Sequence, residues 1–313
     1  MTDWFLGKFA YLSTWLGFKI GCAAVRWFPQ AIFRLSDLLA TIGFHLFRGF
    51  RTRSVNNIQV ALGTVLDRRA IDDTARRSLR NFFRACIEIA VAIESSDEEL
   101  QRRIPVAGRE HLDAALAKGK GVLILSAHLG NFFLVGCRLA LEGHPAWVLV
   151  NQPRDGRFAQ LMDRYRLQVR QRTIHARPRR GALRELGLVL RRNEIAVMIA
   201  DEYRKADGIA VTLFGMTVFA RRGPATLALR SGAAVVPACL IRQPDDSLQL
   251  VIEPELQLAR TEKTKEDVRE NTVRMTQWLE RTVRDYPDQW NWMNIPRPDP
   301  RRATVSDYGL KKI

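Results

Sequence analysis

One histidine in this sequence stands where a general base would be placed. Residues 126–131 read S-A-H-L-G-N and follow an apolar run at 122–125, so His128 lies just beyond the carboxyl end of a predicted buried strand. Substrates of α/β proteins bind in the crevice outside such strand ends. An imidazole with an ordinary pKa of about 6.5 accepts a proton near neutral pH, which suits a general base there. The alternative is a hydrogen-bonded structural histidine.

The residues after His128 favour the same role. Gly130 allows a ligand to approach the backbone closely, and the amides that open the next helix are expected to face a developing oxyanion. The sequence lacks the G-x-S-x-G nucleophile motif, which argues against a hydrolase with a covalent acyl-enzyme. Four other histidines lack a comparable setting and are predicted to be structural or surface residues: His45, His111, His144 and His175.

Apolar runs alternate with helical patterns over the middle of the chain. The runs predict short buried strands, and amphipathic helices are predicted between several of them and at the end. This order indicates an α/β fold with a central mixed, partly parallel sheet flanked by helices. The predicted strands are 122–125, 146–150, 195–200, 233–240 and 248–252, and the predicted helices lie within 54–95 and at 110–118, 131–142, 156–171, 181–192, 224–231 and 263–285.

The first fifty residues are rich in aromatic and aliphatic side chains, but charged residues interrupt them before the roughly 20 uncharged residues of a spanning helix are reached. We expect residues 1–50 to attach the protein to a membrane. They would form either an irregular single-pass anchor with snorkelling cations or amphipathic helices in the interface. A buried helical layer is the alternative. Residues 51–296 are then the catalytic domain, and 297–313 form a basic tail.

The chain of 313 residues carries a formal net charge of +16. Residues 1–60 hold seven Lys and Arg against two acids, and residues 150–192 hold twelve Arg against three acids. Positive charge beside apolar sequence indicates attraction to anionic lipid head groups. The arginine-rich window also suits an acidic carrier protein, a phosphorylated lipid or a nucleic acid, although no nucleic-acid-binding signature accompanies it.

The four cysteines lie far apart and form no C-x-x-C pair, which favours reduced thiols in a cytoplasmic environment over disulfides or a zinc site.

The segment around His128 resembles the lysophospholipid-type acyltransferases, in particular the lauroyl and myristoyl acyltransferases of lipid A biosynthesis and the related mannoside acyltransferases. Their motif places Asp or Glu five residues after the histidine, in runs such as S-A-H-x-G-N-W-E. Here residues 126–133 read S-A-H-L-G-N-F-F, so Phe133 stands at the acidic position.

Further segments extend the resemblance over most of the chain. They are A-D at 200–201, L-F-G at 213–215, R-G-P-A at 222–225, P-D-Q-W-N-W-M at 287–293 and R-S-V-N-N-I at 53–58.

The resemblance implies a glycerolphosphate-acyltransferase-like fold and acyl transfer without a metal or cofactor. The donor would be an acyl carrier protein or coenzyme A thioester, and the acceptor a hydroxyl of a glycolipid or lipid A-type molecule. His128 would remove the hydroxyl proton at the cytoplasmic face of a bacterial inner membrane, where anionic lipids are further partners. A catalytically silent lipid-binding relative of the same fold is the alternative.

Because Phe133 replaces the family acid, another carboxylate is needed to orient His128. Asp201 and Glu202 follow the predicted strand at 195–200, and Asp201 matches an acidic position of the family. Both are therefore candidates for the catalytic acid. The predicted substrate-binding residues are Gly130, Asn131, Arg170 and Arg222.

Overall fold

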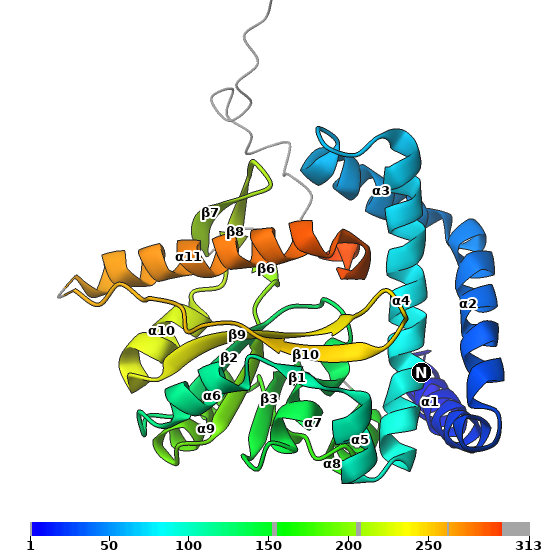
Figure 1. The fold of residues 1–313 in the computed structure, drawn as a ribbon, viewed down its shortest axis with the longest axis horizontal. Coiled ribbons are helices and arrows are strands. Elements are labelled where there is room, and N and C mark those ends of the chain that lie inside the picture. Colours follow the sequence, from blue (N-terminus) through cyan, green and yellow to red (C-terminus); the bar gives the residue numbers. More distant parts are fainter. Residues whose placement is uncertain (1, 152–154, 205–207, 262, 296–313) are drawn as a thin grey trace, which may run out of the picture.

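A computed structural model describes residues 2–151, 155–204, 208–261 and 263–295 of the chain. Helices cover both faces of a central sheet, and α4 stands between this sheet and the N-terminal helices (Figure 1). The helices are α1 Thr2–Trp27, α2 Pro29–Leu46, α3 Arg48–Leu62, α4 Arg68–Glu94, α5 Asp97–Arg103, α6 Arg109–Leu116, α7 Val135–Ala140, α8 Gly156–Gln168, α9 Arg179–Arg191, α10 Gly223–Ser231 and α11 Thr264–Asp285. Three short 3₁₀ turns are η1 Phe132–Leu134, η2 Pro287–Gln289 and η3 Trp292–Asn294.

The central sheet has seven strands in the order β1-β10-β9-β2-β5-β3-β4. Four neighbouring strands, β2, β5, β3 and β4, run parallel, β9 is parallel to β2, and β10 is antiparallel to β9. The sheet is therefore mixed and mostly parallel. The strands are β1 Val106–Ala107, β2 Val122–Ser126, β3 Ala146–Val150, β4 Arg172–His175, β5 Ile195–Ile199, β9 Ala234–Arg242 and β10 Leu248–Ile252.

Strand β2 is the centre of the core because both of its faces are covered. Leu123 and Leu125 belong to one apolar cluster, which also contains residues of α9, α10 and α11. Val122 and Ile124 belong to a second cluster on the other face, with residues of α5, α6 and α7. Such a continuous apolar run is typical of a parallel strand buried on both faces. The strand end that carries His128 is thus fixed by packing from two sides.

A smaller antiparallel sheet follows β5 in the sequence. It consists of β6 Tyr203–Arg204, β8 Met216–Ala220 and β7 Ile209–Leu213, in the order β6-β8-β7. The backbone amide of Phe214, at the turn between β7 and β8, donates a 2.8 Å hydrogen bond to Glu280 of α11. The hairpin therefore lies against the last long helix.

The N-terminal segment is helical, as expected, and α1 and α2 both pack against α4. Among the described residues, twelve of the eighteen exposed large apolar side chains fall between residues 12 and 47, with Trp27 72% and Phe28 67% exposed. None of the described helices is both long enough and apolar enough to cross a bilayer. The predicted boundary at residue 50 falls within α3, and the predicted tail at 297–313 lies outside the described residues.

The predicted α/β fold is confirmed, and all five predicted strands are present within two residues of their expected bounds. Besides the two-residue strands β1 and β6, two parts of the sheet architecture were not predicted. One is β4, in which Ile174 is the only strongly apolar residue, and the other is the β7–β8 hairpin.

Candidate active site

The register of two neighbouring strands brings His128 and Asp201 together. Ser126 at the end of β2 is the partner of Ile199 at the end of the parallel strand β5. His128 and Asp201 each lie two residues beyond these partners, so both emerge side by side at the carboxyl edge of the sheet. This edge is where α/β proteins bind their ligands.

The contact between these residues is direct and partly shielded from water. The imidazole Nδ1 of His128 lies 2.7 Å from Oδ1 of Asp201, and the backbone amide of His128 donates a 3.0 Å bond to Oδ2. The Asp201 side chain is 0% exposed, whereas that of His128 is 23% exposed. The acid is thus enclosed while the histidine remains accessible.

Electrostatics fixes which nitrogen of His128 is free. Burial favours the neutral form of Asp201, but hydrogen bonds and the charge of His128 outweigh it and lower the pKa of this carboxyl. An ionised carboxylate only accepts hydrogen bonds, so Nδ1 must carry the proton and Nε2 is left as the acceptor. Burial likewise opposes the charged form of His128, but Asp201, together with the charge of Glu202, raises the pKa of His128.

The segment 289–291 supports this pair from a third direction. The indole Nε1 of Trp290 donates a 2.8 Å bond to Oδ2 of Asp201, and Trp290 is itself 0% exposed. The Asn291 amide donates to the carbonyl of His128, and the Gly130 amide donates to the carbonyl of Gln289. This closing segment, predicted only as a family block, is therefore part of the site.

Gly130 and Asn131 are committed to neighbouring protein groups. Gly130 has φ +58, and a Cβ at this position would lie 2.0 Å from the carbonyl oxygen of Leu240. The close approach that requires glycine is thus to β9. Asn131 is 0% exposed, and its Nδ2 donates 2.7 Å to Glu88 of α4. Their predicted contact with substrate stays a prediction, since the structure shows both holding the loop in place.

The loop amides are also occupied. The amides of His128, Gly130 and Asn131 donate to Asp201, Gln289 and Leu240, respectively. The expected oxyanion contact of the amides that open the next helix therefore does not involve Asn131, the N-cap residue, and stays a prediction for the amides after it.

Phe133, at the acidic position of the family motif, belongs to a series of aromatic rings that begins at His128. The ring of Phe132 lies 4.7 Å from the imidazole in an edge-to-face arrangement and 4.1 Å from the ring of Phe133. Phe133 lies 6.3 Å from Phe82 of α4, which is 46% exposed. An apolar surface therefore runs from the histidine towards solvent.

The second candidate acid, Glu202, lies at the same edge but contacts other residues. Its Oε2 forms a 2.8 Å ion pair with Arg221, and its Oε1 accepts a 3.1 Å bond from Asn151, which follows β3. Glu202 acts on His128 only through its charge. The hydrogen-bonded acid is Asp201.

The two predicted substrate-binding arginines lie in different places. Arg222 is exposed at the N-cap of α10, next to Arg221 and hence at the edge that holds Glu202. Arg170 precedes the unpredicted strand β4 and therefore lies at the amino edge of the sheet, where it is paired with Asp97. The structure does not bring Arg170 to the His128 edge.

Another acid–histidine contact at the carboxyl edge was not predicted. His175 is the last residue of β4, and its Nε2 lies 3.0 Å from Asp163 of α8. The other oxygen of Asp163 binds Arg166 at 3.0 Å, and burial lowers the pKa of Arg166. The sequence did not predict this contact because β4 contains only one strongly apolar residue, which is too few to identify a buried strand.

Comparison with known proteins agrees with this geometry. The family model for bacterial lipid A biosynthesis acyltransferases matches residues 3–295, so the chain belongs to this family and is an acyltransferase. A phosphatidylinositol mannoside acyltransferase of Mycobacterium tuberculosis is 28% identical over 75% of this chain and 71% of its own length. The Mycolicibacterium smegmatis protein of the same name is 25% identical over 75% of this chain and 77% of its own length. A lipid A biosynthesis acyltransferase of Haemophilus influenzae is 25% identical over 93% of this chain and 89% of its own length.

Gly130 allows a direct test of the loop geometry against a matched glycine. We expect Gly143→Ala to cost about 1–2 kcal/mol, because its φ of +92 is strained for alanine but nothing lies within 4 Å of the added Cβ. Gly130→Ala should cost about 3 kcal/mol or more, since overlap with Leu240 adds to the strain. Denaturant unfolding measures both losses. Equal losses would mean that β9 does not approach the loop this closely.

Proposed function

We propose that this protein transfers a fatty acyl group from a thioester to a hydroxyl of a glycolipid, with His128 as the general base. The observation that carries the proposal is the 2.7 Å contact between Nδ1 of His128 and the buried Asp201, which leaves Nε2 as the acceptor. A glycolipid acceptor is supported by the names of the mycobacterial and Haemophilus relatives.

The proposed reaction needs one base and no covalent enzyme intermediate. Nε2 of His128 takes the proton of the acceptor hydroxyl as its oxygen attacks the thioester carbonyl. The tetrahedral oxyanion then collapses, the C–S bond breaks, and the departing thiolate receives the proton from the imidazolium. Asp201 stabilises the imidazolium between these steps, as a buried carboxylate does in acyl-transferring triads.

We assign the charged parts of the substrates to cations of the same edge. Arg222, the N-cap residue of α10, would bind an anion of the substrate or the oxyanion. We propose the Asp163–Arg166–His175 cluster as a second subsite for an anion, because one carboxylate is shared between the partly exposed Arg166 and a histidine. For the donor, either coenzyme A or acyl carrier protein, we propose the exposed arginines at the start of α9, Arg179 and Arg180, which follow the carboxyl end of β4.

The described residues contain no group of three or more His, Cys, Asp or Glu side chains placed to hold a metal ion. The proposed reaction uses none, and its independence of metals and cofactors remains a prediction.

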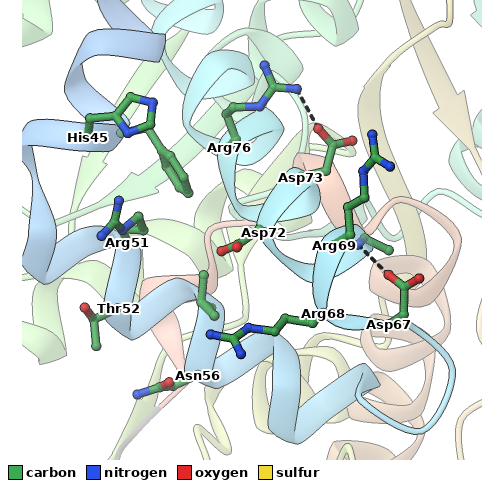
Figure 2. A pocket seen from close by; sticks show the side chains of 13 residues that line it. His45, Arg51, Thr52, Asn56, Asp67, Arg68, Arg69, Asp72, Asp73 and Arg76 are labelled. Atoms are coloured by element: carbon green, nitrogen blue, oxygen red, sulfur yellow. Dashed lines mark hydrogen bonds and ion pairs between the residues drawn. The ribbon is translucent and has the colours of Figure 1, made fainter.

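We further propose that α1 and α2 lie in the interface of an anionic membrane, on the cytoplasmic face of the bacterial inner membrane. Their exposed apolar residues are accompanied by cations, as in interfacial helices. A pocket of roughly 980 Å³ among α2, α3 and α4 is lined by His45 and four arginines, which include Arg51 and Arg68 (Figure 2). Three carboxylates, Asp67, Asp72 and Asp73, also line this pocket, so its four arginines exceed its acids by only one. It begins at Phe44, close to the exposed end of α2, and its polar lining suits lipid head groups.

The alternative of a silent lipid-binding protein rests on Phe133, which takes the place of the family acid. The Asp201 contact weighs against it, since an acid is present at the histidine despite this replacement.

Replacement of His128 tests the proposed chemistry. We expect His128→Ala to abolish acyl transfer from acyl carrier protein or coenzyme A thioesters to a mannosylated or lipid A-type acceptor, measured by mass spectrometry of the lipid product. His144→Ala should retain full activity because His144 lies outside the site. If the wild-type protein binds acceptor vesicles but transfers no acyl group from either donor, the silent alternative is correct.

The pH dependence distinguishes the two candidate acids. A general base acts in its neutral form, so a raised pKa of His128 means that kcat/KM should rise with pH through a midpoint above about 6.5. Asp201→Asn removes the main interaction that raises the pKa of His128. The midpoint should move down, and the maximal rate should fall by roughly 10²–10⁴. Glu202→Gln should move the midpoint less and preserve most of the rate. The opposite order of effects would make Glu202 the partner.

Membrane attachment is tested by removing apolar surface from the junction of α1 and α2. Trp27→Ser combined with Phe28→Ser should weaken binding to phosphatidylglycerol-containing vesicles by at least about tenfold, since burying each ring is worth roughly 1.5–3 kcal/mol. The matched control is Leu183→Ser with Leu188→Ser, two exposed apolar residues of α9. Flotation assays measure both. Equal losses would refute a specific role for α1 and α2.

A further inference from the structure

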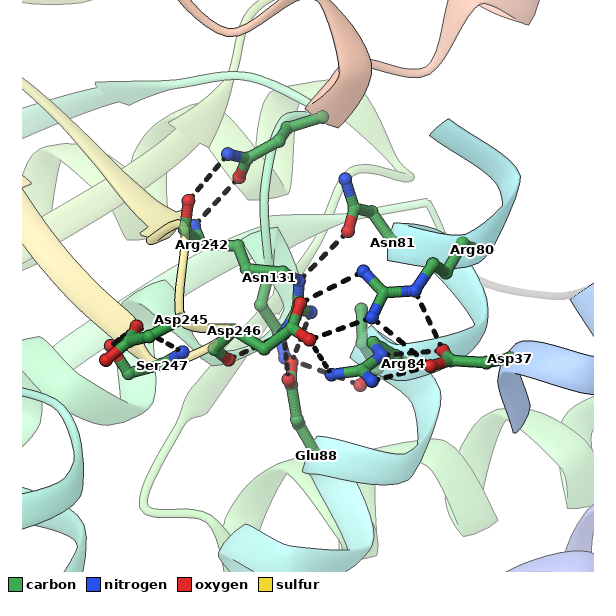
Figure 3. A network of polar contacts seen from close by, with 12 residues as sticks. Asp37, Arg80, Asn81, Arg84, Glu88, Asn131, Arg242, Asp245, Asp246 and Ser247 are labelled. Atoms are coloured by element: carbon green, nitrogen blue, oxygen red, sulfur yellow. Dashed lines mark hydrogen bonds and ion pairs between the residues drawn. The ribbon is translucent and has the colours of Figure 1, made fainter. Parts of the chain in front are cut away.

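A buried ion pair lies directly behind the loop that carries His128. Arg242, the last residue of β9, donates from Nη1 and Nη2 to the two carboxylate oxygens of Glu88 on α4, at 2.6 and 3.1 Å (Figure 3). Their side chains are only 5% and 10% exposed. Arg242 Nε also donates 3.0 Å to Asn81, so the guanidinium is held along its whole edge. The pair fixes the end of β9 against α4.

The side-chain amide of Asn131 connects this ion pair to the loop. Asn131 Nδ2 donates 2.7 Å to Oε2 of Glu88 and 3.4 Å to the carbonyl of Ala85. Asn131 Oδ1 is buried and has no hydrogen-bond partner among the described residues. The orientation of this amide therefore depends on the acceptors of Nδ2, of which Glu88 is the nearer and the charged one.

The same residues also hold the backbone of the loop. The Asn131 amide donates to the carbonyl of Leu240, two residues before Arg242. Gln289 binds both backbone groups of Arg242 at 2.8 Å, and its own carbonyl accepts the amide of Gly130. The end of β9 and the segment at 289 thus form one unit with the loop. The Glu88–Arg242 pair holds its β9 side on α4, while Ser78 and Asn81 of α4 bind the carbonyls of Trp290 and Asp288 on its other side.

We propose that Glu88 and Arg242 are positioning residues for His128, acting through Asn131. Only the expected loss of reaction rate rests on the proposed function. The expected change in the position of the His128 ring does not depend on it. Loss of Glu88 leaves Arg242 as a buried cation without its carboxylate and Asn131 Nδ2 without its nearer acceptor. The loop then keeps only the longer 3.4 Å bond from Asn131 to Ala85 as its direct side-chain link to α4, and the imidazole is no longer held in line with Asp201.

The ring of His128 itself reports on this geometry. The test uses the full chain in detergent micelles, labelled with ¹³C at histidine Cε1, and follows the pH titration of the resonance that disappears in His128→Gln. The carboxylates that face this ring are Asp201 and Glu202, and both remain in every variant. The variants are Glu88→Ala, Asn131→Ala and their combination.

In the wild type the pKa of His128 should lie above its ordinary value of about 6.5. Glu88→Ala and Asn131→Ala should each lower it towards that value. Asn131→Ala carries no change of charge, so its shift separates positioning from loss of a distant negative charge. The double variant should shift no further than either single variant, because the two residues act in series. Additive shifts, or an unchanged titration in the folded single variants, would overturn the proposal.

A second buried ion pair provides the control. Arg138 of α7 and Glu142, in the turn after it, are each 5% exposed, and Arg138 also donates to the carbonyl of Ile104, away from the loop. Glu142→Ala should therefore destabilise the protein but leave the titration of His128 unchanged. If Glu88→Ala fails to fold by circular dichroism, Glu88→Gln keeps an acceptor for Asn131 and should give a smaller shift in the same direction.

Activity is measured in the same variants. Transfer from palmitoyl-coenzyme A or palmitoyl acyl carrier protein should fall by about 100-fold in kcat, with KM for the thioester nearly unchanged, since misplacement of a catalytic group by about 1 Å has this effect. A wild-type protein that transfers nothing would refute the proposed function, while the titrations would still decide the positioning role.

Discussion

A carboxylate that is fully removed from water determines the arrangement of the site. The side chain of Asp201 is 0% exposed, and burial alone would favour its neutral form. Three donors reverse this preference: Nδ1 and the backbone amide of His128, and the indole of Trp290. Two of these donors belong to the residue that the acid orients. The bonds that keep Asp201 ionised therefore also fix the ring of His128, and neither residue reaches this state without the other.

The position of this acid explains how the site retains a carboxylate although Phe133 replaces the one in the family motif. Ser126 and Ile199 are partners in two parallel strands, so the residues two positions beyond them are neighbours in space. An acid after β5 thus reaches His128 by strand register alone. The ring of Phe133 instead packs against Phe132, which extends the apolar surface beside the histidine. The replacement changes what covers the imidazole but does not remove its acidic partner.

How much the sequence predicts depends on whether a contact is set locally or over a long range. Apolar runs located β2, β5 and β9 because nearly every residue of these strands is buried. They also located β3 and β10, in which buried residues alternate with partly exposed ones that are mostly apolar too. His128 and Asp201 were both found because each directly follows such a run. Arg170 was expected near the substrate, but it lies at the opposite edge because the short strand β4 after it has too little apolar character to detect. The contacts around Asn131 could not be predicted from the sequence either, because Glu88 lies 43 residues before it and Arg242 lies 111 residues after it.

Stability alone does not explain the buried Glu88–Arg242 pair. Removing two charges from water costs free energy, and apolar residues of the same volume often stabilise a fold as much or more. The geometry of the pair is specific, however, and further polar contacts link Arg242 to residues nearer the surface. The carbonyl of Asp246 accepts a bond from Arg242, while its carboxylate pairs with Arg80 and Arg84, which also bind Asp37 of α2 (Figure 3). Helix α2, with its exposed apolar surface, and the His128 loop are therefore attached to α4 through one connected set of ion pairs and hydrogen bonds. The contacts that seat α2 on α4 and those that hold the His128 loop therefore meet at Asp246, whose carboxylate binds Arg80 and Arg84 and whose carbonyl binds Arg242.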